Sequence, residues 1–345
     1  MNKISFYDTK SYDKIYFEQL KEKYECEIEY HEAKLNKSTA VLAKDSDCVC
    51  AFVNDELDKE TLEILYSYGI TLVVMRCAGY NNIDFQYAFG KIHVLRVPAY
   101  SPYAVAEATM GMLLMLNRKL HKAYIRTRDF NFSLNGLVGF DLHGKTIGIV
   151  GTGKIGRTFI DVCSGFGMNM LMYDPYPIKD SNYHYVSFEE LCEKSDIISL
   201  HCPLTKESYH IINNDAIDRM KEGVYILNTS RGALIDSEAL LKGLKSGKIG
   251  AAGLDVYEEE SDLFFEDFSG KIIQDDILAR LVTFPNVLVT SHQAFLTHEA
   301  LENIADTTLS NVYDYFHDKK LVNEVCYHCS RETTNCQHRL NKPCF

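Results

Sequence analysis

Short apolar runs alternate with amphipathic stretches along the first hundred residues. Helical spacing appears in DKIYFEQLKEKY (13–24) and DKETLEILYSYG (58–69). Strand-like runs occur at KISFYD (3–8), DCVCAFVN (47–54), ITLVVMRCAG (70–79) and HVLRVP (93–98). This alternation predicts parallel βαβ units in the first part of the chain.

A stronger pattern of the same kind begins at Lys145. The stretch KTIGIVGTGKIGRTFIDVCSGFGMNMLMYD (145–174) predicts a strand, a glycine turn, a helix and a second strand. Further strands are predicted at DIISLHCP (196–203), GVYILNTS (223–230), IGAAGLDVY (249–257) and VLVTSH (287–292), with helical segments between them. We therefore expect a doubly wound parallel α/β domain of the Rossmann type.

Two long helical patterns flank this second domain. One covers 100–124, where Ser101 can cap the helix and Pro102 suits its first turn. The other covers 296–319 and lies beyond the last predicted strand, so we expect it to return to the first domain. The predicted organisation is α/β with two domains, one built from 1–100 plus 297–325 and one from 101–296.

Composition narrows the classes of partner. The 345 residues carry a net charge of −12, which argues against nucleic acid, because phosphate binding needs a basic surface. The start lacks the apolar region of a signal peptide, and no apolar run is long enough to span a bilayer. These features predict a soluble cytoplasmic protein that is not bound to a membrane.

The glycine turn GTGKIG (151–156) has the context of a dinucleotide-binding site. An apolar strand precedes it, a helix follows, and Asp174 ends the next strand. Gly151 permits the tight turn, Gly153 a close approach of pyrophosphate, and Gly156 close packing of helix on strand. The Asp174 carboxylate would accept hydrogen bonds from the hydroxyls of the adenosine ribose and would repel a 2′-phosphate. The predicted cofactor is therefore NAD and not NADP.

Polar side chains follow three other predicted strands. They are Arg231 after one strand, Asp255 with the glutamates 258–260 after another, and His292 after a third. Ligands of open α/β sheets bind beyond the carboxyl ends of the strands. An arginine can grip a carboxylate, a histidine can protonate a carbonyl, and a carboxylate beside the histidine would keep it protonated. This set suits the reduction of a 2-keto acid, and the residues alone do not choose among the three glutamates.

The motifs VGTGKIG, NTSRGALID, LDVYEEE and TSHQAF, in that order, resemble those of the D-isomer-specific 2-hydroxyacid dehydrogenase family. The match extends upstream through RCAGYNNID and VPAYSP, and covers about residues 1–325. It is most similar to the fermentative D-lactate dehydrogenases, which share AYSP, DVYE-x-E and a long acidic and aromatic segment before the histidine. The resemblance implies reversible, NAD-dependent reduction of pyruvate to D-lactate by a homodimer or homotetramer with a flavodoxin-like, discontinuous catalytic domain.

The resemblance also implies individual roles. Arg231 would bind the substrate carboxylate, His292 would be the proton donor, and Glu260 would be its carboxylate partner. Backbone amides at Cys77, Ala78 and Gly79 would hold the substrate, and Tyr100 and Phe295 would line a small pocket. The residues implied to surround NAD, besides the glycines and Asp174, are Lys154, Ile155, Cys202, Pro203, Thr229, Ser230 and Asp255.

Two positions depart from the family pattern: Ser291 stands where many relatives have proline, and Glu259 where small residues are common. Two other functions stay open. The substrate could be a larger 2-keto acid, such as 2-ketoisocaproate, or hydroxypyruvate. The chain could instead be a corepressor-like protein that senses NAD without catalysis, although the acidic, aromatic segment disfavours this.

The cysteines fall into two groups. Seven lie in apolar contexts and are predicted to be reduced core thiols: Cys26, Cys48, Cys50, Cys77, Cys163, Cys192 and Cys202. The other four crowd an extension, 326–345, past the expected family end. Cys326 and Cys329 have C-x-x-C spacing and could serve zinc with their neighbours. We favour a variable extension without metal and keep the zinc site as the alternative.

Overall fold

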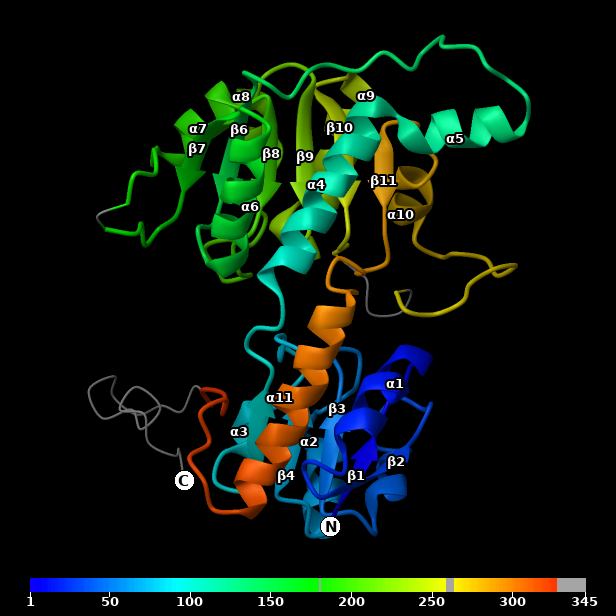
Figure 1. Ribbon diagram of the computed structural model, residues 1–345, viewed down its shortest axis with the longest axis vertical. Helices are drawn as coiled ribbons and strands as arrows, with labels where there is room; N and C mark the ends of the chain where they lie inside the picture. Colours follow the sequence, from blue (N-terminus) through cyan, green and yellow to red (C-terminus); the bar gives the residue numbers. More distant parts are fainter. Residues whose placement is uncertain (180, 259–263, 328–345) are drawn as a thin grey trace. The chain divides into compact units, whose positions relative to one another are not determined.

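The computed structural model describes residues 1–179, 181–258 and 264–327 (Figure 1). The chain divides into two compact units, one of Met1–Ser101 with the chain from Thr297 onward, and one of Pro102–Leu296. Each unit is an α/β fold around a parallel sheet, so the predicted fold class is confirmed.

Unit 1 contains a five-stranded parallel sheet in the order β2-β1-β3-β4-β5. This is the flavodoxin-like strand order. Its strands are β1 (Asn2–Phe6), β2 (Cys26–Tyr30), β3 (Cys48–Ala51), β4 (Leu72–Met75) and β5 (His93–Arg96).

Strand β2 was missed in the sequence. Its side chains alternate, with Cys26 buried and the glutamates 27 and 29 exposed. It lies at the sheet edge, where charged side chains are favoured because they prevent pairing with other chains. Lys3 on the neighbouring strand pairs with Glu29 at 2.8 Å. The charges that mark a protected edge strand made this segment look like loop.

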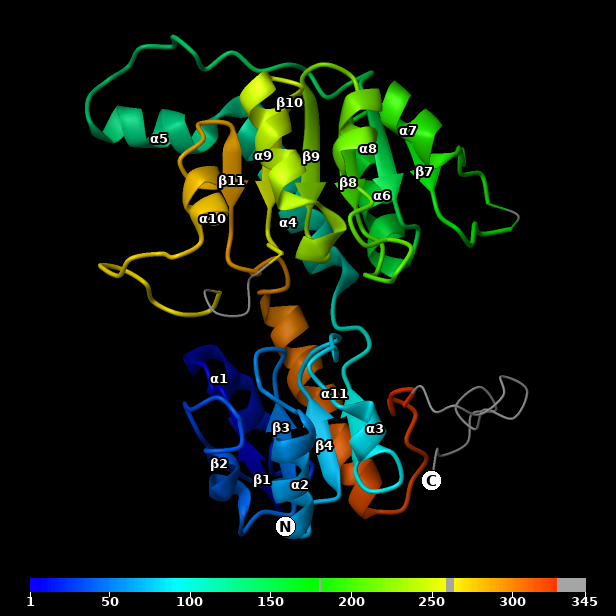
Figure 2. The same ribbon diagram turned by 180° about the vertical axis from the view of Figure 1, so that it is seen from behind.

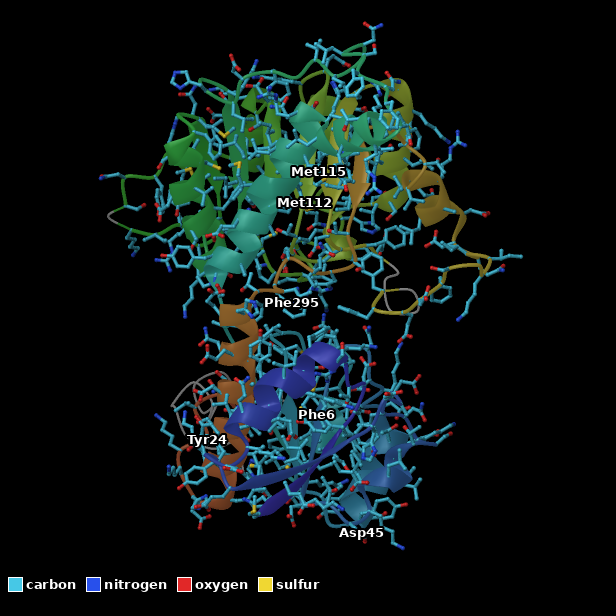
Figure 3. All side chains as sticks on the ribbon, turned by 45° about the vertical axis from the view of Figure 1, so that its right-hand side comes forward. Phe6, Tyr24, Asp45, Met112, Met115 and Phe295 are labelled. Atoms are coloured by element: carbon cyan, nitrogen blue, oxygen red, sulfur yellow. The ribbon has the colours of Figure 1, made fainter. Side chains whose placement is uncertain are left out.

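The two faces of this sheet are covered by helices from different parts of the chain. Helices α1 (Ser11–Leu20) and α11 (His298–Phe316) pack together on one face, and α11 also contacts β4 and β5. The opposite face carries η1 (Ala40–Ala43), α2 (Lys59–Ser67) and α3 (Phe85–Ala88) (Figure 2). Phe6 on β1, labelled in Figure 3, is fully buried and its ring lies 4.8 Å from that of Phe17 on α1.

The chain beyond α11 returns to the edge of the same sheet. Glu324 forms an antiparallel bridge with Leu95, and Val325 donates to the carbonyl of Val94 at 3.0 Å. The side chain of Tyr327 is buried, and its hydroxyl accepts from the Val94 amide at 2.8 Å. Tyr327 therefore belongs to the core of unit 1, beyond the predicted domain end at Val325.

Unit 2 contains a six-stranded parallel sheet in the order β11-β10-β9-β8-β6-β7. Tyr185 adds a parallel bridge to Met172 on β7. With that bridge counted as the third strand, the sheet order in chain numbering is 3-2-1-4-5-6-7, which contains the 3-2-1-4-5-6 order of dinucleotide-binding folds. The strands are β6 (Thr146–Val150), β7 (Asn169–Tyr173), β8 (Ile197–Leu200), β9 (Val224–Asn228), β10 (Ile249–Leu254) and β11 (Val287–Val289).

Helices cover both faces of this sheet as well (Figures 1 and 2). On one face α4 (Pro102–Arg118) packs against α6 (Lys154–Gly165) and the strands β9 to β11. Met112, labelled in Figure 3, is one of the buried residues of α4. The other face carries α7 (Phe188–Lys194), α8 (Asn214–Arg219), α9 (Ser237–Ser246) and α10 (Asp276–Leu281).

The predicted long helix over 100–124 is wrong in one respect, because it is broken at Lys119. That residue has a left-handed backbone with φ of 52°, and α5 (Leu120–Arg128) starts afresh after it. Just before the break, the Asn117 side chain donates to the carbonyl of Phe140 at 2.7 Å and accepts from the Phe140 amide at 2.9 Å. This tertiary contact anchors the last turn of α4 to the segment that follows α5.

The seven predicted core thiols are all buried and free of disulfide bonds. Burial raises the pKa of the Cys192 thiol and of the Cys163 thiol to about 12, so both stay protonated. In the part of the chain that the structure describes, no helix is long and apolar enough to cross a membrane.

Candidate active site

The glycine turn after β6 forms a site suited to an anion. Gly151 has φ of 98°, and Gly153 is the N-cap of α6 without a side-chain cap, so the first N–H groups of the helix remain available to a ligand. A Cβ on Gly156 would lie 2.0 Å from the Gly151 carbonyl oxygen, whereas a Cβ on Gly153 would meet no atom of the described residues within 4 Å. The helix therefore packs closely on the turn at Gly156, and space for a pyrophosphate remains beside Gly153. Lys154 and Ile155 lie in the first turn of α6.

Asp174 is fixed beside this turn. Its Oδ2 accepts from the amide and the hydroxyl of Thr152, at 2.7 and 2.9 Å, and its Oδ1 accepts from the Tyr176 amide at 2.9 Å. Tyr185 in turn donates to the Thr152 hydroxyl at 2.9 Å. The carboxylate predicted to bind the adenosine ribose is thus oriented by Thr152 and Tyr185, which were not predicted from the sequence.

The ends of β8 and β9 are joined by side-chain hydrogen bonds. Ser230 donates to the Cys202 carbonyl at 2.7 Å, and the hydroxyls of Thr229 and Thr109 on α4 are 2.8 Å apart. Burial raises the pKa of the Cys202 thiol to about 11, so the thiol is protonated at neutral pH. Of the residues implied to surround NAD here, Cys202, Thr229 and Ser230 form one connected rim, and Pro203 follows it in the chain.

Arg231 leaves β9 on a turn shaped by Asn228. The buried Asn228 amide donates to the Arg231 carbonyl at 2.8 Å and accepts from the Ser230 amide at 3.1 Å. The Arg231 guanidinium is half-buried and donates to the Ser230 carbonyl at 2.7 Å. Asn228 was not predicted as a site residue, although asparagine at a strand end is a frequent turn former and was a usable signal.

Asp255 ties the neighbouring strand ends together. Its amide donates to the Asn228 carbonyl at 2.9 Å, and its carbonyl accepts from the His292 amide at 2.7 Å. Its buried carboxylate accepts from the Thr290 hydroxyl at 2.5 Å and from the amides of Gln293 and Ala294 at 2.9 and 2.8 Å. Asp255 therefore fixes the segment that carries His292, in addition to the predicted role near NAD.

His292 has a left-handed backbone, with φ of 53°. Such a conformation is costly for a residue with a side chain and is found at sites where surrounding contacts impose it. Here the Asp255 hydrogen bonds supply those contacts. The His292 ring packs 5.9 Å from the ring of Phe265, while the adjacent Phe264 is buried in the core. The aromatic part of the segment before the histidine thus supports its imidazole.

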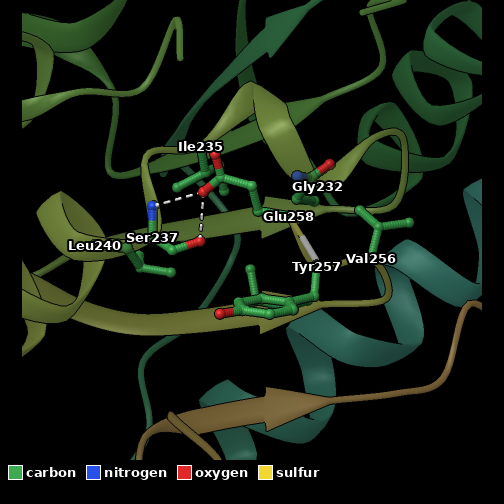
Figure 4. Close-up of a pocket in the computed structure, with 9 residues that line it drawn as sticks. Gly232, Ile235, Ser237, Leu240, Val256, Tyr257 and Glu258 are labelled. Atoms are coloured by element: carbon green, nitrogen blue, oxygen red, sulfur yellow. Dashed lines mark hydrogen bonds between the residues drawn. The ribbon is translucent and has the colours of Figure 1, made fainter. Parts of the chain in front are cut away.

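Of the three consecutive glutamates, Glu258 contacts His210 and Ser237, and its bonds to Ser237 are drawn in Figure 4. Its carboxylate lies 2.5 Å from His210 Nε2 and accepts from the Ser237 hydroxyl at 2.9 Å. A Cβ on Gly232 would lie 1.9 Å from the Tyr257 carbonyl oxygen, so glycine is required where η2 (Gly232–Leu234) meets this segment. Glu259 and Glu260 lie outside the described residues.

The predicted substrate-binding residues of unit 1 follow β4. The Cys77 carbonyl accepts from the Val97 amide at 3.1 Å, and the Ala78 carbonyl accepts from Arg96 at 2.7 Å. Tyr100 is half-buried, and its carbonyl accepts from Asn303 on α11 at 2.8 Å. Phe295 belongs to unit 2, where it is half-buried at the end of the segment held by Asp255 (Figure 3).

A metal centre finds no support in the residues that the structure describes, among which no group of three or more histidine, cysteine or acidic side chains could hold an ion. The candidate zinc ligands His328, Cys329, Cys336, His338 and Cys344 lie outside these residues. The zinc alternative for the extension therefore stays a prediction.

Comparison with known proteins agrees with this geometry. The family model of the D-isomer specific 2-hydroxyacid dehydrogenase NAD-binding domain matches residues 110–294. A 2-hydroxyacid dehydrogenase homolog of Haemophilus influenzae is 53% identical over 316 residues, which cover 90% of this chain and 95% of the relative. The D-lactate dehydrogenase of Escherichia coli is 50% identical over 328 residues, 94% of this chain and 99% of that protein.

The apo-structure of D-lactate dehydrogenase from Escherichia coli superposes with a TM-score of 0.86 at 47% sequence identity. The superposition covers 94% of this chain and 99% of that one.

Proposed function

Because this chain belongs to the D-isomer-specific 2-hydroxyacid dehydrogenase family and is an NAD-dependent enzyme, we propose that it reduces pyruvate to D-lactate with NADH. The observation that carries the proposal is the hydrogen-bonded connection through Asp255. The Asp255 amide binds the Asn228 carbonyl and the Asp255 carbonyl binds the His292 amide, so the turn of Arg231 and the segment of His292 are held as one assembly.

The proposed steps follow from the chemistry of these side chains. Arg231 grips the substrate carboxylate through two parallel hydrogen bonds and fixes the plane of the keto acid. His292 gives a proton to the carbonyl oxygen and takes it back in the reverse direction. When bound, NADH would supply the hydride for the carbonyl carbon. Glu260, the proposed partner of His292, would favour the protonated imidazole by its negative charge.

The test measures NADH oxidation with pyruvate, followed by NAD⁺ reduction with D- and with L-lactate. We expect turnover with pyruvate and with D-lactate only. His292→Ala and Arg231→Ala should lower kcat/KM by about 100- to 10,000-fold, with NADH affinity retained. His184→Ala, at an exposed histidine of unit 2, is the control and should be active. Unchanged turnover in either site variant would remove the assignment.

The alternatives are separated by the same assay. A panel of 2-ketoisocaproate, hydroxypyruvate and pyruvate ranks the substrates by kcat/KM, and a higher value for either of the first two would replace pyruvate as the substrate. NADH binding without turnover of any 2-keto acid would favour the corepressor-like alternative.

We also propose that the enzyme self-associates through the segment 119–138 of unit 2. Helix α5 has no buried residue, which is unusual for a helix that carries apolar side chains. The segment exposes a run of large apolar residues that a second copy would cover. These residues, each more than half exposed, are Leu120, Tyr124, Ile125, Phe130, Phe132, Leu134 and Val138.

A further inference from the structure

We propose that Arg96 is a positioning residue for the substrate, which acts by fixing the orientation of the Ala78–Gly79 peptide. This inference rests on the proposed function, because it concerns the loop whose amides would hold the carboxylate of the keto acid. Arg96 belongs to none of the motifs of the chain, and only the folded structure shows what its side chain contacts.

The backbone of Arg96 is immobilised at the last position of β5. It is the register partner of Met75 on β4, its amide donates to the Asn323 carbonyl at 3.1 Å, and its carbonyl accepts from Asn311 on α11 at 3.0 Å. The pairing of the two strands continues beyond their ends, since the Val97 amide donates to the Cys77 carbonyl. The Arg96 side chain therefore starts from a fixed point beside the loop after β4.

The guanidinium holds the residues on both sides of Gly79. Arg96 Nη1 donates to the Ala78 carbonyl at 2.7 Å. The centre of the guanidinium lies 4.8 Å from the centroid of the Tyr80 ring, within the range of a cation–π contact. The Tyr80 ring is itself supported edge-on by Phe85, at a centroid distance of 5.7 Å.

Because the peptide between Ala78 and Gly79 is planar, the contact of the Ala78 carbonyl with Arg96 also sets the direction of the Gly79 N–H. In a trans peptide the carbonyl and the N–H point to opposite sides. Because the Ala78 carbonyl points to the guanidinium, the Gly79 N–H points away from it. Among the described residues, none accepts a hydrogen bond from the amide of Ala78 or of Gly79. Successive unpaired amides are a common cradle for an anionic oxygen.

The loop needs such an anchor because it contains a glycine. Rotation of the Ala78–Gly79 peptide changes φ of Gly79, and glycine accepts positive and negative φ almost equally. A flipped peptide would present the Ala78 carbonyl where the Gly79 N–H belongs, and that oxygen would repel a carboxylate. The charge-assisted bond from Arg96 favours one of the two orientations.

The other arginine at this edge is engaged inside unit 1. Arg76 is buried, donates to the Asp8 carbonyl at 2.6 Å and lies 3.5 Å from the Asp13 carboxylate. Its guanidinium also packs on the rings of Phe6 and Phe52. Arg76 therefore stabilises the core, while the half-buried Arg96 contacts the loop itself.

The test compares Arg96→Met, Arg96→Lys and wild type by pyruvate KM, kcat and NADH affinity. Binding of oxamate, a pyruvate analogue that accepts no hydride, to the NADH-saturated protein gives a readout without turnover. We expect Arg96→Met to raise KM and the oxamate Kd about 10-fold or more, with kcat changed less and NADH affinity unchanged. Arg96→Lys keeps a charged donor, so its KM and its oxamate Kd should lie between those of wild type and those of Arg96→Met.

Arg219→Met, at an exposed arginine of unit 2, is the matched control and should behave as wild type. If Arg96→Met fails to fold, Tyr80→Leu replaces it, because that change removes the ring under the guanidinium, and it should raise KM about 3-fold. An unchanged KM and oxamate Kd in the folded variants of an active enzyme would overturn this inference alone. A wild-type protein that turns over no 2-keto acid would remove both this inference and the proposed function.

Discussion

At the scale of single residues, the acidic side chains after β10 differ in what they contact. Asp255 is buried and binds the segment that carries His292, whereas Glu258 binds His210 and Ser237. A carboxylate already engaged in two hydrogen bonds with one cluster is not available to orient an imidazole elsewhere. This leaves the assignment of Glu260, which came from the family spacing, as the one to test.

Replacement of the glutamates one at a time should separate these tasks. Glu260→Gln should depress pyruvate reduction and lower the pH at which it declines, because His292 would lose the charge that keeps it protonated. Glu258→Gln should retain activity and lose about 1–2 kcal/mol of unfolding free energy with its charged hydrogen bonds. Glu259→Gln serves as the control. Loss of activity in Glu258→Gln with an active Glu260→Gln would show that the register is wrong.

His201 at the end of β8 should make stability depend on pH. Its imidazole packs against Phe159, with ring centroids 4.9 Å apart, and burial lowers its pKa to about 3. In the unfolded chain the pKa of this imidazole is about 6.5. Between about pH 3 and about pH 6.5 the unfolded state therefore binds a proton that the folded state does not bind. Stability should therefore be lost as the pH falls below about 6.5.

His201 alone should lower the free energy of unfolding by about 1.4 kcal/mol when the pH falls from about 7.5 to about 5.5. Urea unfolding of wild type and of His201→Gln at both pH values measures it. The variant should show a smaller pH dependence by about that amount, and equal pH dependence in the two proteins would contradict the assignment.

The sequence was sufficient for the residues that end strands and insufficient for those that support them. Arg231, Asp255 and His292 follow apolar runs and could be named from the chain alone. The pairing of His210 with Glu258 joins positions far apart in the chain, and no local pattern indicates it. Thr152 and Phe265 were missed for the same reason, since their partners lie far away in the chain. Asn228 is different, because an asparagine at a strand end is a local signal of a turn that was not used.

At the scale of elements, the turn into α6 depends on how closely the helix approaches the strand. A methyl group on Gly156 would collide with the Gly151 carbonyl oxygen, whereas a methyl group on Gly165, in the same helix, would meet no atom of the described part of the chain within 4 Å. The two glycines therefore form a matched pair for substitution by alanine.

Gly156→Ala should raise the Kd of NADH at least about 10-fold and lower the unfolding free energy by about 1–3 kcal/mol, because the helix must move off the turn. Gly165→Ala should leave NADH binding intact and keep or slightly raise stability, since alanine favours the helix. Titration of NADH and thermal unfolding of both variants check this. Equal behaviour of the two variants would mean that close packing at the turn is not needed.

Periodicity predicted most elements, and it failed where tertiary contacts override it. All six strands of the unit 2 sheet were predicted, because buried parallel strands are continuous apolar runs. Edge strand β2 has polar alternation and was missed. The break at Lys119 is a left-handed backbone at a single residue, which the spacing of apolar residues does not encode.

At the scale of the whole molecule, the apolar surface of 119–138 makes self-association testable. Sedimentation of wild type should give a dimer or a larger assembly, and the double variant Phe130→Ser with Phe132→Ser should dissociate toward the monomer at micromolar concentration. Ile272→Ser, which changes another exposed apolar residue of unit 2, is the control and should keep the wild-type mass. A monomeric wild type would refute the proposed contact.

The discontinuity of unit 1 has a consequence for synthesis on the ribosome. The first 101 residues supply all five strands of its sheet, but α11, which packs on α1 and contacts β4 and β5, emerges only after the whole of unit 2. Unit 2 is one continuous segment and can close as soon as β11 has left the exit tunnel. A nascent sheet thus waits with one face incompletely covered while about 195 residues are translated, which takes on the order of 10–40 seconds at about 5–20 residues per second. During that interval the exposed face is a target for chaperones.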